Sequence, residues 1–82
     1  MRVRVLVRPK EGILDPQGQA VERALAALGH DRVSNVHVGR LIELDVPDGD
    51  PDAITERVEE MCERLLANPL IESYEVEPLA DD

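Results

Sequence analysis

A ten-residue connection, from Pro9 to Gly18, constrains the fold of this chain more than any other stretch of the sequence. Pro9 and Pro16 fix φ near −65°, while Gly12 and Gly18 allow torsions and close approaches that a Cβ forbids. Asp15 can accept hydrogen bonds from the free amides of a first helical turn, where Pro16 suits position N1. Most connections need only about 4–6 residues. The stretch is therefore either a shaped binding surface or a well-specified loop without a ligand.

The residues on either side of this connection predict a strand and a helix. Residues 2–8 alternate, with valines on one face and mostly arginines on the other, which is typical of a half-buried strand. A helix is predicted from about Pro16 to Leu28, ended by Gly29, with an apolar stripe of Val21, Ala24, Leu25 and Leu28. Gly18 in its first turn costs up to about 1 kcal/mol relative to alanine. Either something approaches the backbone closely there, or a glycine is tolerated near a frayed helix end.

The segment from 33 to 46 has apolar residues at one parity: Val36, Val38, Ile42, Leu44 and Val46. A two-residue hairpin turn at Gly39-Arg40 would place Val36 opposite Glu43 and break this pattern. We therefore predict one long strand, bent or bulged near Gly39, with two strands joined at Gly39 as the alternative. A strand longer than its neighbours leaves an unpaired edge, which calls for a partner or a protective device.

The second half of the chain repeats the same helix start, with Asp50 as N-cap and Pro51 at N1. The helix that follows presents an inward stripe of Ile54, Val58, Met61, Cys62, Leu65 and Leu66. Pro69 ends the helix, residues 70–76 form the last strand, and residues 78–82 are expected to be a loose acidic tail.

The predicted order is β-α-β-α-β, in a single α+β domain that spans residues 1–82. Crossovers of this length favour a two-layer, ferredoxin-like arrangement, with two helices on one face of an antiparallel sheet and a long bent middle strand. The core must be aliphatic, because Tyr74 is the single aromatic residue. A chain of this size buries a limited share of its surface, so oligomerisation is a natural supplement.

Composition argues against several partners and compartments. Nine basic and 18 acidic residues give a net charge of −9, which leaves no basic footprint for nucleic acid. No apolar run approaches the roughly 20 residues that cross a membrane, and the N-terminus is typical of a strand rather than a signal peptide. We therefore expect a cytoplasmic protein without nucleic-acid or membrane partners.

The sequence predicts no catalytic, cofactor-binding or metal-binding residues. His30 and His37 lie in no recognised nucleophile motif, and Cys62 falls on an apolar helical stripe, which favours a buried core thiol. Arg57 and Arg64 are interspersed with Glu56, Glu59, Glu60 and Glu63, which favours a solvated helix face over a cation site. The glycines match no phosphate loop, and Lys10 is the most plausible anion contact. These patterns indicate a small acidic interaction module.

Several segments together resemble the PurS family: Pro9 to Gly18, Ala24 to Gly29, Val36 to Arg40, Glu43-Leu44, and Leu65 to Val76. The resemblance covers nearly the whole chain in order. It implies a non-catalytic small subunit of phosphoribosylformylglycinamidine synthase, in purine biosynthesis. In that enzyme a glutaminase subunit releases ammonia, and a large synthetase subunit uses ATP and Mg to insert it. The resemblance implies that the small subunit forms a homodimer or a higher homo-oligomer, is required for assembly and assists ammonia transfer.

The resemblance also implies where partner subunits bind. It places contacts on Lys10, Gly12, Asp15, Pro16 and Gly18, and a second contact surface on Asn68, Pro69 and Glu72. Helix capping alone could account for the presence of Asp15 and Pro16 in this motif. The rival interpretation is a free-standing dimeric module that senses a small ligand, and its signature would be saturable metabolite binding by the isolated protein.

Overall fold

The computed structural model of this protein describes residues 1–79. Its elements are, in order, β1 (Arg2–Pro9), α1 (Pro16–Ala27), β2 (Arg40–Asp45), α2 (Pro51–Met61), a π-helical turn η1 (Cys62–Leu66) and β3 (Glu72–Leu79). This order confirms the predicted α+β class. Both helices begin as the sequence predicts, with an aspartate before the helix and a proline in its first turn.

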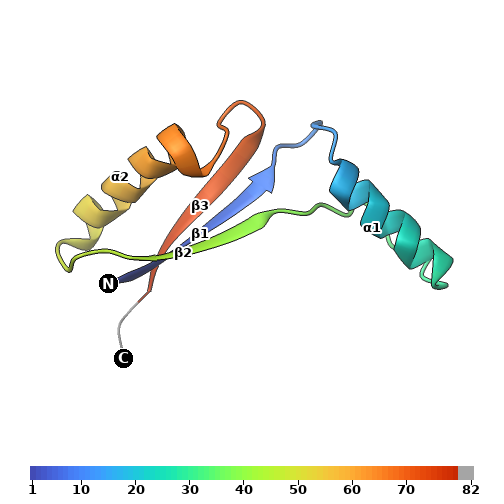
Figure 1. The fold of residues 1–82 in the computed structure, drawn as a ribbon, viewed down its shortest axis with the longest axis horizontal. Helices are drawn as coiled ribbons and strands as arrows, with labels where there is room; N and C mark the ends of the chain where they lie inside the picture. Colours follow the sequence, from blue (N-terminus) through green and yellow to red (C-terminus); the bar gives the residue numbers. More distant parts are fainter. Residues whose placement is uncertain (80–82) are drawn as a thin grey trace.

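The three strands form one antiparallel sheet in the order β2-β1-β3. Central Val5 lies opposite Ile42 on one side and Val76 on the other. One face of the sheet therefore carries the valines of β1, and α2 packs over this face against β3 (Figure 1). The buried core consists of Val3, Val5, Val7, Ile54, Val58, Cys62 and Ala67. It is aliphatic, and the Cys62 thiol is buried in it, as predicted.

The opposite face of the sheet is polar, because the second parity of β1 consists mainly of arginines. Each arginine approaches a carboxylate on a neighbouring strand: Arg2 to Asp45 at 3.5 Å, Arg8 to Glu75 at 3.9 Å and Arg4 to Glu77 at 4.0 Å. These side chains are 40% exposed or more, so each pair contributes at most about 1 kcal/mol. The arginines hold no surplus positive charge for an anionic ligand.

The position of α1 corrects the predicted arrangement of two helices on one face. Figure 1 shows α1 extending beyond one end of the sheet, far from α2 and from both termini. The radius of gyration is 16.0 Å, whereas a compact chain of this length would have about 12 Å. Periodicity predicted the helix correctly but could not tell which surface its stripe contacts. Leu28 of that stripe is 75% exposed.

The long strand predicted from 33 to 46 is also corrected, because β2 begins only at Arg40. Its pairing with β1 ends at Val7, shortly before Pro9, which has no N–H to donate. Residues 34–39 instead form a connection without assigned secondary structure. Two of its amides bond side chains of the α1 region: Val36 donates to Glu22 at 3.3 Å and Val38 donates to Asp15 at 2.8 Å.

The end of the second helix differs from the predicted stripe. A hydrogen bond of 3.0 Å from the Ala67 amide to the Cys62 carbonyl closes a wide π-type turn. The turn holds one residue more than an α-helical turn, so the α-helical periodicity is lost here. Leu65, predicted to face inward, is 82% exposed.

The last strand is displaced relative to the prediction, since it begins at Glu72 and continues to Leu79. Pro78 lies opposite Val3, so residues 78 and 79 belong to the sheet rather than to an acidic tail. The rest of the predicted tail, residues 80–82, lies outside the described residues. Within residues 1–79 no helix is long and apolar enough to cross a membrane.

Candidate functional site

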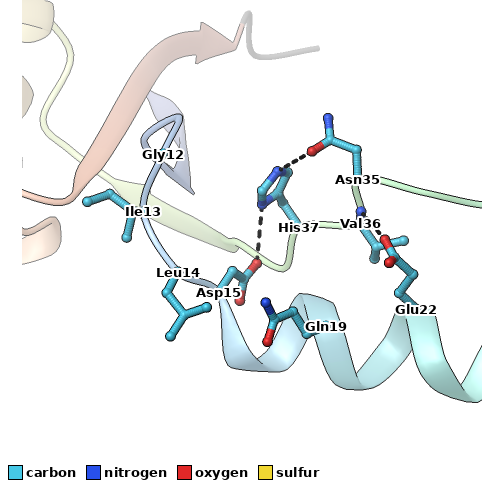
Figure 2. Close-up of a pocket in the computed structure, with 9 residues that line it drawn as sticks. All are labelled: Gly12, Ile13, Leu14, Asp15, Gln19, Glu22, Asn35, Val36 and His37. Carbon is cyan, nitrogen blue, oxygen red and sulfur yellow. Dashed lines mark hydrogen bonds and ion pairs between the residues drawn. The ribbon is translucent and has the colours of Figure 1, made fainter.

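Asp15 joins α1 to the rest of the chain (Figure 2). Its Oδ1 accepts a hydrogen bond from the Gly18 amide at 3.0 Å, which caps α1, and its Oδ2 accepts one from the Val38 amide at 2.8 Å. These two backbone donors lower the pKa of the Asp15 carboxyl below its ordinary value, and His37 adds a smaller effect in the same direction. Its side chain is only 9% exposed. The main role of Asp15 is therefore structural, because it connects the start of α1 to Val38.

Gly18 is the one buried residue of α1. A Cβ at this position would collide with the carbonyl oxygen of Val36 and with the carboxylate of Asp15. The close approach that the sequence suggested is confirmed, and the approaching group is the chain's own backbone. Gly18 therefore allows α1 and the segment 34–39 to meet.

An open groove of about 460 Å³ lies between the loop at Gly12–Asp15 and residues 35–37 (Figure 2). His37 lies on its wall, with Nε2 at 3.0 Å from the Asn35 side-chain oxygen and Nδ1 at 3.5 Å from the Asp15 carboxylate. No serine, cysteine or lysine is among the residues that line the groove. The Asp15–His37 pair thus has no nucleophile to activate. The described part of the chain contains no group of three acidic, histidine or cysteine side chains placed to hold a metal ion.

The second predicted contact motif forms the turn between η1 and β3. Glu72 accepts hydrogen bonds from the Asn68 amide at 2.8 Å and from Arg40 Nη2 at 2.9 Å. The same Arg40 nitrogen donates to the Leu66 carbonyl at 3.0 Å, and the Asn68 side-chain oxygen accepts from the Leu70 amide at 3.2 Å. Asn68 and Glu72 therefore fix the shape of this turn.

The two predicted contact motifs meet at one end of the sheet. The Lys10 amide donates to the Ile71 carbonyl at 2.9 Å, and Pro9 lies opposite Glu72 in the sheet. Gly12 has a φ of +81° with open space around it, as expected of a turn glycine on a surface. We call the residues exposed or partly exposed here the sheet-end surface: Lys10, Gly12, Asn68, Pro69 and Leu70.

Asp15, Pro16 and Gly18 lie apart from the sheet-end surface, at the base of α1. At the sheet-end surface and its turn, sequence reasoning missed two residues, Leu70 and Arg40. Leu70 is 84% exposed. In the sequence it could have been recognised as an apolar residue in a turn, directly after the proline that ends the helix. Arg40 fixes the turn by hydrogen bonding to the Leu66 carbonyl. In the sequence it could have been recognised as the one charged residue among the apolar residues at every second position from 36 to 46.

A model of the family described as PurS, phosphoribosylformylglycinamidine (FGAM) synthase, matches residues 2–80 of this chain. The chain is 45% identical over 76 residues to phosphoribosylformylglycinamidine synthase subunit PurS of Bacillus subtilis, covering 93% of this chain and 89% of that protein. The chain belongs to the PurS family. Another member of the PurS family, the subunit of Methanocaldococcus jannaschii, is 39% identical over 72 residues, covering 88% and 87% of the two chains.

Solved structures of the PurS family share this fold. Bacillus subtilis PurS superimposes with a TM-score of 0.79 at 44% identity, over 93% of this chain and 94% of that one. A chain in the structure of PurLQS from Thermotoga maritima gives a TM-score of 0.84 at 32% identity, over 95% of each chain. The extended shape, with α1 beyond the sheet, is thus compatible with known members of the family.

Proposed function

We propose that this protein is the non-catalytic small subunit of phosphoribosylformylglycinamidine synthase. The similarity to a PurLQS chain over 95% of both chains carries the proposal, because that structure contains a PurS chain within a multisubunit complex. The enzyme makes formylglycinamidine ribonucleotide from formylglycinamide ribonucleotide, glutamine and ATP. In this proposal the protein works in the cytoplasm, and ATP and Mg are bound by the synthetase subunit.

The partners in this proposal are a large synthetase subunit and a glutaminase subunit, which this chain brings together so that ammonia can pass between them. The sheet-end surface is proposed as one contact region. Its turn is fixed by Arg40 and Glu72, and a fixed turn loses little entropy on binding. It presents exposed Leu70 and the cation of Lys10.

The chain is also proposed to form a homodimer through α1 and the segment 34–39. The apolar stripe of α1 is only partly covered within residues 1–79, where Leu28 is 75% exposed and Val21 is 41% exposed. The amides of Asn35 and His37 have no hydrogen-bond partner in the same described region. A segment with free amides can pair with a second copy of itself, and α1 can then bury its stripe against that copy.

Reconstitution with the two larger subunits tests this function. The mixture should show glutamine-dependent synthesis that requires this protein, whereas ammonia-dependent synthesis by the synthetase alone should not require it. Glutamine-dependent synthesis at full rate without this protein would contradict the proposal. So would saturable binding of a metabolite by the isolated protein together with no binding to either subunit.

The variant Lys10→Glu with Gly12→Val tests the sheet-end surface. It reverses one charge and places a β-branched residue at a φ of +81°, in open space outside the core. We expect a folded protein by circular dichroism, weaker complex formation in gel filtration, and a matching fall in glutamine-dependent activity. Ammonia-dependent activity of the synthetase should not change. Normal assembly by the folded variant would show that this part of the loop is scaffolding.

A further inference from the structure

The outer side of α2 and η1 carries an apolar patch bordered by charge. It consists of Arg57, Glu60, Met61, Arg64 and Leu65, which line a shallow hollow of about 340 Å³. We call these residues the α2 outer patch. Leu65 is 82% exposed and Met61 is half-buried. The core stripe of Ile54, Val58 and Cys62 is buried against the sheet, so this patch is a second apolar surface of the same helix.

The exposure of Leu65 is built into the structure rather than caused by a frayed helix end. The wide turn closed by the Ala67 amide and the Cys62 carbonyl places Leu65 outside. Arg40 then fixes the end of this turn, because it donates to the Leu66 carbonyl and also pairs with Glu72 at 2.9 Å. Such π-type turns occur frequently at functional sites. An exposed leucine on a braced turn is preorganised for contact with another surface.

The charges of the α2 outer patch indicate the chemistry of its partner. Arg64 pairs with Glu60 at 3.3 Å on the same helix. Arg57 has no ion-pair or hydrogen-bond partner within residues 1–79, although the chain carries twice as many acidic as basic residues. A cation left unpaired beside an exposed apolar side chain fits a partner surface with a carboxylate at the rim of an apolar hollow.

We propose that the α2 outer patch docks a partner subunit of the complex, whose surface receives Leu65 in an apolar hollow and pairs Arg57 with a carboxylate. This inference rests on the proposed function and adds a contact surface separate from the sheet-end surface. A second copy of this chain is a poorer occupant. The uncovered stripe and free amides lie on α1 and residues 34–39, at another part of the fold (Figure 1).

The test uses the full chain and the two larger subunits, each purified separately, with binding measured by calorimetry. Leu65→Ala and Arg57→Gln should each weaken binding to one of the subunits, by about tenfold for the leucine and less for the arginine. Added salt should weaken wild-type binding more than Arg57→Gln binding, because the lost contact is ionic. Leu65→Ala should keep the wild-type salt dependence. The homodimer should persist in both variants.

Arg32→Gln is the matched control, since it removes one exposed positive charge from the loop after α1. It should change binding by less than about twofold. Unchanged binding of Leu65→Ala and Arg57→Gln to both subunits would overturn the inference while leaving the proposed function intact. Dissociation of the homodimer by either variant would show that a second copy occupies the patch. Wild-type protein that binds neither subunit would overturn the proposed function and this inference together.

Discussion

The two helices of this chain begin with the same residues and end in opposite environments. Asp15-Pro16 starts α1 and Asp50-Pro51 starts α2, and each helix carries an apolar stripe at helical spacing. The α2 stripe is buried against the sheet at Ile54 and Val58, whereas only Gly18 is buried in α1. Periodicity therefore shows that a helix has an apolar face. The loops before and after the helix decide whether that face can pack against the rest of the same chain.

The helix that packs less against the core has the better hydrogen-bonded N-cap. Asp15 caps α1 and also binds the Val38 amide, while Asp50 makes no side-chain cap bond. The packed helix is held by core contacts, and the projecting helix is held by hydrogen bonds at its base. We take α1 to be an element that completes its packing outside its own chain.

The largest expected effect is a loss of stability when the α2 stripe is shortened. Ile54→Ala should lower the free energy of unfolding by about 2–5 kcal/mol, because it leaves a cavity in the core. Leu28→Ala on α1 should lower it by only about 0.5 kcal/mol or less when the protein is too dilute to associate. Urea unfolding followed by circular dichroism measures both. Equal losses at that dilution would mean that α1 packs within its own chain.

Gly18→Ala should lower the free energy of unfolding by about 1–3 kcal/mol, since the new methyl group collides with backbone and must push α1 away from Val36. Gly49→Ala is the control, because the nearest atom to a Cβ there is a flexible side-chain carbon of Ile54 at 4.0 Å. Thermal unfolding of the two variants measures the difference. A Gly18→Ala protein as stable as wild type would show that the α1 junction adapts freely.

The caps should differ when each aspartate is replaced. Asp15→Ala should lower the free energy of unfolding by about 1–2 kcal/mol, and Asp50→Ala by no more than about half as much. The lowered pKa of Asp15 adds a dependence on pH, since its contribution is full above the ordinary value of 3.8 and is lost as the pH falls through the lowered pKa. The difference in stability between wild type and Asp15→Ala should therefore be smaller at pH 3 than at pH 7, and a difference that does not shrink on acidification would contradict this assignment.

The smallest effect concerns a side-chain hydrogen bond that joins η1 to strand β3 of the sheet. Tyr74 donates a hydrogen bond of 2.7 Å to Glu63, which raises the pKa of Tyr74 to about 12. Glu63→Gln should return this pKa toward its ordinary value of 10.0. In the wild type the contribution of this bond is present below pH 10 and is lost as the pH rises through about 12. Ultraviolet absorbance reports it directly because Tyr74 is the single aromatic residue, and an unshifted titration would show that the bond does not form.

The sequence was sufficient for the type and order of the elements but insufficient for the bounds of β2 and β3 and for long-range placement. Alternation and capping residues are local signals, so β1 and both helix starts were predicted correctly. The π-type turn that exposes Leu65 depends on an Arg40 contact across 26 residues, which no local pattern reports. The start of β2 at Arg40 depends on where its pairing with β1 ends, at Val7. Of the site residues, Gly18 was singled out correctly for a close approach, but nothing in the sequence identified the Val36 carbonyl as the group that approaches.

Sedimentation equilibrium of the wild-type protein tests the central claim most directly, namely that α1 packs against a second copy. At tens of micromolar, a concentration at which stable homodimers persist, the mass should be at least twice the 9.1 kDa of one chain. Leu28→Asp, which places a charge on the exposed stripe without touching the core, should return the mass to that of a single chain and retain its secondary structure. A wild-type protein that sediments as a single 9.1 kDa chain at this concentration would contradict the account.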